Sequence, residues 1–141
     1  VLFRSLIQMT FSMLETTFRA LLRTLDPQAC SRGTAPFDGV AKCLLKTHLD
    51  QPPDALALVD LLREVRNTVH NNGIYFHRDW QDKAVQFRGV TYNFQIGKSV
   101  DFVGGPFLVE RLDDVRELLW AVVTHPNVIG IPTIPDPSAS A

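Results

Sequence analysis

Apolar residues recur every three or four positions in four segments of the chain, and this spacing predicts amphipathic helices. The predicted helices cover residues 6–25, 37–49, 55–70 and 106–124. In the third of them the apolar stripe consists of Leu58, Leu62, Val65 and Val69. Helices with one apolar stripe must bury it against each other, so we expect a bundle around one core. Phe107 and Trp120, on the last helix, are expected in that core or in a dimer seam.

Capping and helix-breaking residues separate the predicted helices. Asp26-Pro27 ends the first helix, because the residue before a proline is disfavoured in helical conformation. Asp54 suits the start of the third helix, where its carboxylate can accept hydrogen bonds from unpaired backbone amides. Asn71-Asn72-Gly73 marks the end of that helix, since asparagine and glycine tolerate the left-handed conformation. Pro106 fits the first turn of the last helix.

The pattern changes to a strict alternation of apolar and polar residues between about residues 84 and 97. Val90, Tyr92 and Phe94 alternate with Thr91 and Asn93. A turn that contains a glycine, at residues 88–89, separates this run from a shorter one before it, which predicts a β-hairpin. The expected fold class is therefore mainly α: a four-helix bundle with a β-hairpin inserted before the last helix.

The length of 141 residues is typical of one domain, which we expect over residues 6–126. Residues 127–141 contain several prolines and are expected to form an extended tail. Residues 1–5 look like the in-frame translation of a common sequencing adapter. We interpret them as non-native, with the true N-terminus missing upstream.

Composition and charge narrow the classes of function. Hydrophobic residues make up 45% and charged residues 21%, which excludes a disordered or low-complexity chain. The formal net charge is −1, whereas proteins that hold nucleic acid mainly by charge are strongly basic, so any RNA contact must come from a local site. Cys30 and Cys43 match no zinc or disulfide framework, which favours reduced thiols and a cytoplasmic location.

Three kinds of ligand or partner are not expected from the sequence. No apolar run reaches the roughly 18 residues that a membrane-spanning helix needs. No group of histidine, cysteine and acidic residues has metal-ligand spacing, so we expect no metal. No phosphate-binding glycine motif occurs, and no cofactor is expected.

Polar residues with catalytic potential collect on the third predicted helix. Arg63, Arg66, Asn67 and His70 are three or four residues apart, so a helix places them on one stripe. Arginine offers bidentate donors for phosphate oxygens, and histidine can donate or accept a proton near neutral pH. Cleavage of a phosphodiester by a ribose 2′-hydroxyl needs charge stabilisation and proton transfer, and it needs no metal.

A structural interpretation of the same residues stays open. Cationic side chains near the end of a helix interact favourably with its dipole. Arg63 and Arg66 could pair with Asp60 or Glu64 as part of a solvated face. Spacing alone therefore does not decide between a catalytic site and a stabilised helix end.

The segment Arg63-Glu-Val-Arg-Asn-Thr-Val-His-Asn-Asn-Gly73 resembles the signature of HEPN domains. In that family an arginine, usually followed by a polar residue, precedes a histidine with four to six residues in between. Arg66-Asn67 supplies the arginine and polar pair, but only three residues separate Arg66 from His70. Six residues separate Arg63 from His70, and Arg63 is followed by glutamate. Either arginine therefore remains a candidate.

The resemblance implies a fold and an activity. HEPN domains are helical bundles that commonly dimerise, and active members are metal-independent ribonucleases of toxin–antitoxin, abortive-infection and CRISPR systems. The implied catalytic residues are Arg66, His70, Asn67 and Arg63. Asn71 and Asn72 are assigned to substrate binding, with RNA as substrate, a second copy as partner and an antitoxin protein as a further partner.

Two alternatives remain besides the ribonuclease. Other HEPN domains have lost catalysis and serve as binding modules, so the same stripe could hold a nucleotide, RNA or a protein. A third interpretation is a helical interaction domain in which the polar stripe fixes the register of a dimer.

Overall fold

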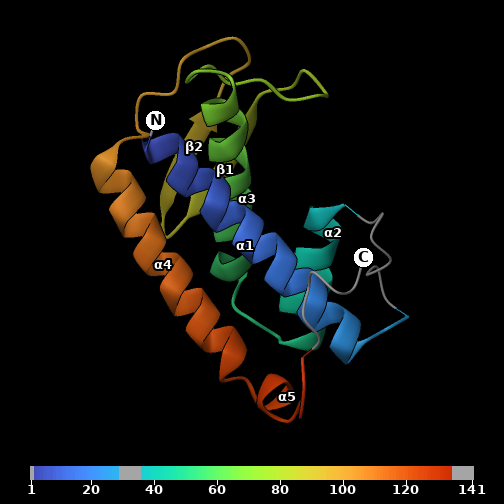
Figure 1. Cartoon of the computed structure of the whole chain (residues 1–141). Helices are drawn as coiled ribbons and strands as arrows, with labels where there is room; N and C mark the ends of the chain where they lie inside the picture. The colour runs from blue at the N-terminus through green and yellow to red at the C-terminus, as the bar shows by residue number, and fades with distance from the viewer. Residues whose placement is uncertain (1, 29–35, 135–141) are drawn as a thin grey trace. The chain divides into compact units, whose positions relative to one another are not determined.

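A computed structural model describes residues 2–28 and 36–134, and the chain is mainly helical (Figure 1). Its elements are α1 (Leu2–Leu25), α2 (Phe37–Lys42), the π-helix η1 (Cys43–His48), α3 (Pro53–His70), β1 (Lys83–Phe87), β2 (Val90–Phe94), α4 (Gly105–Val123) and α5 (Pro126–Ile129). The mainly α class and the hairpin before the last long helix are confirmed. No helix within the described ranges is long and apolar enough to cross a membrane.

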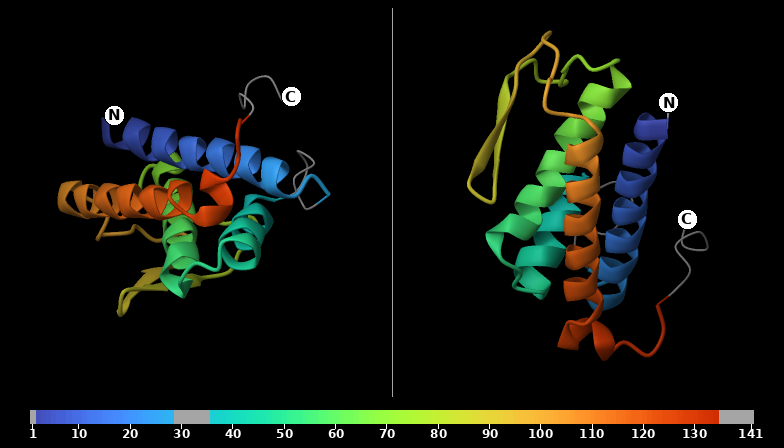
Figure 2. Two further views of the ribbon diagram at one scale, coloured as in Figure 1. Left: turned by 90° about the horizontal axis from the view of Figure 1, so that it is seen from below. Right: turned by 90° about the vertical axis from the view of Figure 1, so that its left-hand side faces the viewer.

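The predicted hairpin forms with a tight turn. β1 and β2 pair antiparallel, from Lys83 opposite Phe94 to Phe87 opposite Val90. Arg88 and Gly89 connect them with φ of 49° and 77°, and positive φ at both central residues matches the twist of antiparallel strands. Figure 2 shows the hairpin on one side of α3 and the first turns of α1 on the other.

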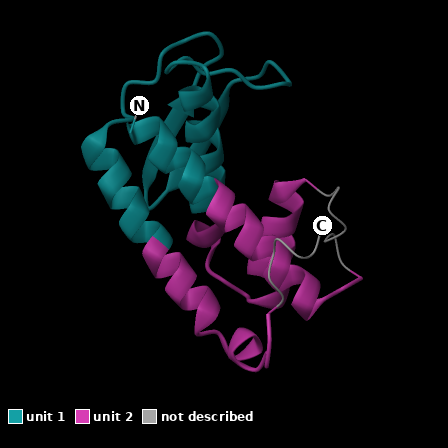
Figure 3. Cartoon of the chain, in the orientation of Figure 1, with its two compact units in different colours: residues 1–11, 57–115 teal, residues 12–56, 116–141 magenta. Residues whose placement is uncertain are grey.

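The chain divides into two compact units (Figure 3). Unit 1 comprises residues 1–11 and 57–115, and unit 2 comprises residues 12–56 and 116–141. The single domain over residues 6–126 stays a prediction.

Unit 1 buries apolar side chains from all of its elements. Its buried hydrophobic residues are Ile7, Phe11, Leu58, Val59, Leu61, Leu62, Val65, Tyr75, Phe87, Phe94, Phe107, Leu108 and Val115. The predicted stripe of α3 is confirmed except at Val69, which is half-buried. Aromatic rings join the hairpin to this core, since Tyr75 and Phe94 have ring centroids 5.2 Å apart.

Unit 2 contains a helical segment that departs from α-helical geometry. The second predicted helix begins as expected at Phe37 but continues from Cys43 as a π-helix. The Leu49 amide donates to the Leu44 carbonyl at 3.0 Å, which brings residues five apart above one another. Leu44, Leu45 and Leu49 are all buried, and the wider turn lets all three face the core of this unit. Cys43 is half-buried.

The structure moves several helix boundaries. α1 begins at Leu2, four residues before the predicted start, and α3 begins at Pro53. The extended tail predicted from residue 127 is wrong at its start, because residues 126–129 form the short helix α5. The His125 side chain caps this helix by accepting a hydrogen bond from the Asn127 amide at 3.1 Å. Residues 135–141 of the predicted tail and Cys30 lie outside the described residues.

The two aromatic residues of α4 have different environments. Phe107 is 8% exposed and lies in the core, as expected. Trp120 is 69% exposed, so the core alternative is wrong for this residue, and the dimer seam stays a prediction. The buried positions of this helix include Leu108, Val115 and Leu118, which follow a spacing that puts Trp120 on the outer face.

Candidate functional site

The end of α3 fixes the position of His70. Asn72 and Gly73 have φ of 56° and 88°, and the Gly73 amide donates to the Thr68 carbonyl at 3.0 Å. This bond closes the helix with a Schellman motif, as the Asn-Asn-Gly sequence predicts. His70 therefore occupies the last turn, and its side chain is exposed.

The predicted polar stripe lies on the side of α3 opposite its most buried residues. With about 100° of rotation per residue, Arg63, Arg66, Asn67 and His70 share one side of the helix. The opposite side carries buried residues such as Leu61 and Val65. Arg63, Arg66 and Asn67 are half-buried, and exposure increases towards His70. The helix thus brings the four predicted catalytic residues to one face that solvent reaches.

Arg63 lies beside two acidic side chains. Its Nη2 is 3.5 Å from Asp60 Oδ1, and its Nε is 3.4 Å from Glu64 Oε1. The side chains of Arg63 and Asp60 are 29% and 38% exposed, and an ion pair this accessible to solvent contributes little to stability. The two carboxyl groups nevertheless offset part of the positive charge that a phosphate would meet at Arg63.

Arg66 packs on an aromatic ring. Its Cζ lies 4.1 Å from the centroid of the buried Phe11 ring of α1. The ring face attracts the cation and holds the planar guanidinium in one orientation.

The end of the stripe is held by amide side chains. Gln8 Nε2 lies 3.4 Å from both Nδ1 and Nε2 of His70, which places the Gln8 amide against the imidazole. Asn71 Nδ2 donates to the Asn67 carbonyl at 2.8 Å. Asn71 and Asn72 are exposed, as a role in substrate binding requires.

Sequence reasoning missed a buried polar pair behind the stripe. Glu64 is 2% exposed, and its Oε2 accepts a hydrogen bond from the hydroxyl of the fully buried Tyr75. Burial and the neighbouring Glu64 raise the pKa of Tyr75 above its ordinary value. The spacing of Leu61, Glu64 and Thr68 along α3 follows its buried face, and this was the signal that could have found Glu64.

The remaining histidines have local partners. His77 Nδ1 lies 2.8 Å from Asp79 Oδ1 in the loop before β1. In unit 2, His48 Nε2 lies 3.2 Å from Asp26 Oδ2, at the end of α1. Within residues 2–28 and 36–134, no group of three histidine, cysteine or acidic side chains is arranged to hold a metal ion.

Comparison with known proteins adds no assignment: no family model, no curated protein and no solved structure matches this chain.

Proposed function

We propose that this protein is a HEPN-like, metal-independent endoribonuclease, acting in the cytoplasm as a homodimeric toxin or phage-defence effector. The observation that carries the proposal is the exposed His70 in the last turn of α3, with two arginines one and two turns earlier on the same helix face. An antitoxin protein is the expected partner.

The proposed reaction is attack by a ribose 2′-oxygen on the adjacent phosphorus. The P–O5′ bond breaks, and the products are a 2′,3′-cyclic phosphate and a 5′-hydroxyl. His70 acts as general acid or base, accepting the proton of the 2′-hydroxyl or protonating the leaving oxygen. Two copies facing each other across α3 would supply one histidine for each transfer.

The surroundings of the two arginines favour Arg66 as the phosphate ligand. Arg63 lies beside two carboxyl groups, whereas the guanidinium of Arg66 is oriented by Phe11. A fixed guanidinium can stabilise the charge that develops on the phosphate without reorganising during the reaction. Asn67 would orient Arg66 or His70, and the exposed Asn71 and Asn72 would contact the RNA.

The test is cleavage of mixed single-stranded RNA by the purified protein in EDTA, with analysis of the product ends. We expect 2′,3′-cyclic phosphate ends from the wild type and at least about a hundredfold lower rate from His70→Gln, which keeps an amide partner for Gln8 but cannot transfer protons. Arg66→Ala should lower the rate more than Arg63→Ala.

Matched variants control for loss of a histidine or of positive charge. His77→Gln removes the other histidine of unit 1, and Arg116→Ala removes an exposed arginine of α4. Both should keep the wild-type rate. Cleavage that survives in His70→Gln, or that requires a divalent metal, would contradict the proposal.

A non-catalytic binding module is the second candidate, and the carboxyl groups beside Arg63 favour it. In that case the same stripe would bind RNA or a nucleotide without turnover. A folded wild type that binds RNA in a manner sensitive to Arg66→Ala, yet leaves it intact, would assign this function instead.

A further inference from the structure

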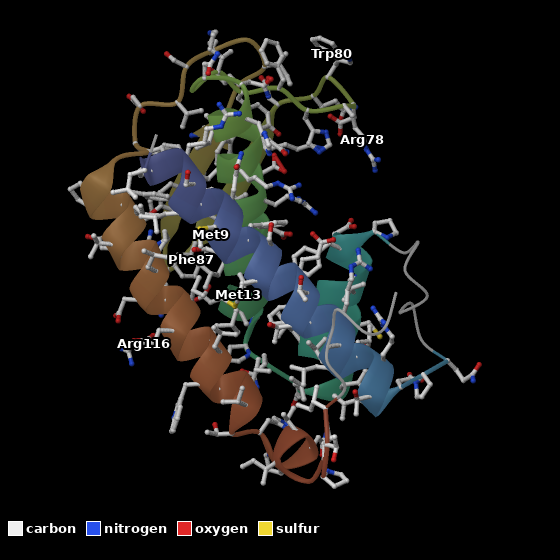
Figure 4. All side chains as sticks on the ribbon, viewed as in Figure 1. Met9, Met13, Arg78, Trp80, Phe87 and Arg116 are labelled. Carbon is white, nitrogen blue, oxygen red and sulfur yellow. The ribbon has the colours of Figure 1, made fainter. Side chains whose placement is uncertain are left out.

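The loop between α3 and β1 exposes two aromatic side chains. Trp80 is 71% exposed and Phe76 is 37% exposed. Their ring centroids are 5.9 Å apart with an interplanar angle of 75°, so the rings meet edge to face. An edge-to-face partner supports the indole without covering both of its faces. Figure 4 shows Trp80 projecting outward from this loop.

Hydrogen bonds around Asp79 hold the loop in a strained conformation. Trp80 has a φ of 56°, which is unfavourable for a bulky residue, and its amide donates to the His77 carbonyl at 2.9 Å. Lys83 Nζ donates to Asp79 Oδ2 at 2.6 Å, and the Gln81 amide donates to Asp79 Oδ1 at 3.0 Å. The bond from Lys83 is the main cause that lowers the pKa of Asp79 to about 2, so this carboxylate stays charged at neutral pH.

The loop carries an exposed cation two residues before Trp80. Asp79 is bonded to Lys83, and Asp82 Oδ1 accepts a hydrogen bond from the Ile96 amide at 2.9 Å. Arg78 lies two residues before Trp80 and is exposed, and Figure 4 shows its side chain pointing away from the loop. Exposed aromatic rings that stack on bases, together with cationic side chains that contact the backbone, are the groups by which proteins bind single-stranded nucleic acid.

We propose that Trp80 and Phe76 form a stacking platform for an unpaired base of single-stranded RNA, with Arg78 contacting the RNA backbone. This rests on the proposed function, because it takes RNA as the ligand. The platform would hold the substrate strand near its own loop and account for RNA binding by a chain with no net basic charge.

The size of the platform favours a base over a protein partner. A stable protein interface buries roughly 800 Å² on each side. Trp80 and Phe76 are two rings on one short loop, whereas stacking a base requires only one ring face. Stacking is also tolerant of sequence, so the expected preference is for single strands rather than for a particular base.

The experiment uses the fluorescence of Trp80 as its readout. The chain has two tryptophans, so Trp120→Phe leaves Trp80 as the only one. In this variant, combined with His70→Gln to prevent cleavage, we expect saturable quenching by a single-stranded RNA decamer. The same strand in a duplex should quench much less. The matched reporter Trp80→Phe, in which Trp120 remains, should show no quenching.

Affinity is then measured by anisotropy of a labelled decamer. Trp80→Gly suits this test, because glycine adopts positive φ without strain and the backbone of the loop is kept. We expect at least about fivefold weaker binding, the lower limit for loss of one stacked base. Arg78→Ala should weaken binding and reduce its salt dependence.

The outcomes separate this inference from the proposed function. Quenching without cleavage by the wild type would support the platform and reject the nuclease. Cleavage together with unchanged affinity in Trp80→Gly would reject the platform and keep the nuclease. Equal binding of duplex and single strand, or loss of self-association in Trp80→Gly, would also overturn the inference, and the latter would assign the rings to a protein contact.

Discussion

Two arginine-containing regions of unit 1 differ in how deeply their polar side chains are buried and in how closely neighbouring groups hold them. Arg111 of α4 is 8% exposed. Its Nε donates to Asp114 Oδ2 at 2.8 Å, and its Nη1 donates to the Tyr92 hydroxyl at 2.9 Å. The rings of Phe87 and Phe107 each lie 5.2 Å from its Cζ. A second arginine, Arg88 of the hairpin turn, contacts Asp114 Oδ1 at 2.5 Å.

The polar stripe of α3 ends instead in an exposed side chain, His70. Gln8 reaches the exposed His70 only at 3.4 Å, which is long for a hydrogen bond. The Arg66 guanidinium of the same stripe packs on the buried Phe11 ring and is half-buried. The comparison teaches that an arginine beside aromatic rings is not in itself a binding site. The buried Arg111 serves to join the hairpin to α4, whereas the α3 stripe keeps an imidazole within reach of a ligand.

The largest expected effect comes from breaking the Arg111 cluster. Asp114→Ala removes the buried carboxylate that both Arg111 and Arg88 contact, and it leaves Arg111 with the carboxylate of the exposed Glu110, whose Oε2 lies 3.3 Å from Nη2. We expect a loss of about 3–5 kcal/mol in the free energy of unfolding, because breaking a buried ion pair is costly. Urea denaturation followed by circular dichroism measures it.

The adjacent Asp113 provides the matched control. It is an exposed carboxylate of the same helix, and Asp113→Ala should change stability by less than about 0.5 kcal/mol. Equal effects of the two variants would show that the cluster contributes no more than a surface charge, and the comparison would fail.

A smaller effect is expected from the buried pair behind the α3 stripe. Tyr75→Phe removes the hydroxyl that donates to Glu64 and leaves that buried carboxyl group without this donor. We expect a loss of about 1.5–3 kcal/mol, the range for hydrogen bonds to charged groups. The difference in stability from the wild type is measured at neutral pH by denaturant unfolding.

The raised pKa of Tyr75 also predicts the direction of a pH dependence. Above about pH 10 the unfolded tyrosine loses its proton while the buried Tyr75 keeps it, so the folded state binds more protons. The stability that Tyr75 contributes is therefore complete below pH 10 and decreases as the pH rises further. The gap between wild type and Tyr75→Phe should narrow in that range. A constant gap up to pH 11 would mean that Tyr75 is not buried as described.

Local sequence signals predicted most of the fold. The Asn-Asn-Gly end of α3 and the Arg-Gly turn of the hairpin both need positive φ, and both formed where expected. The π-helix η1 was not predictable, because its hydrogen-bond shift depends on burying Leu44 and Leu49 together. The sequence left Trp120 between the core and a dimer seam, and its helical position, opposite the buried residues of α4, excludes the core.

The site could be predicted only in part. Spacing along one helix correctly placed the four stripe residues on one face, since that is a property of the helix alone. The partner that orients Arg66 comes from elsewhere, since Phe11 lies 55 residues earlier in the sequence (66 − 11 = 55). Tyr75, the partner of the buried Glu64, lies beyond the end of α3. Such contacts depend on tertiary packing, which no local pattern encodes.

The smallest expected effect is on the stability of His70→Gln, and it sharpens the comparison with Arg111. His70 is exposed, its contacts with Gln8 are long, and glutamine can replace them. We expect the free energy of unfolding at pH 7.5 to change by less than about 0.5 kcal/mol, as for other surface substitutions. The same variant is expected to lose RNA cleavage. We therefore expect His70→Gln to lower activity without lowering stability, and Asp114→Ala to lower both. A loss of stability in His70→Gln that matches the loss in Asp114→Ala would make His70 a structural residue, and the α3 stripe would then be a second structural cluster rather than a site.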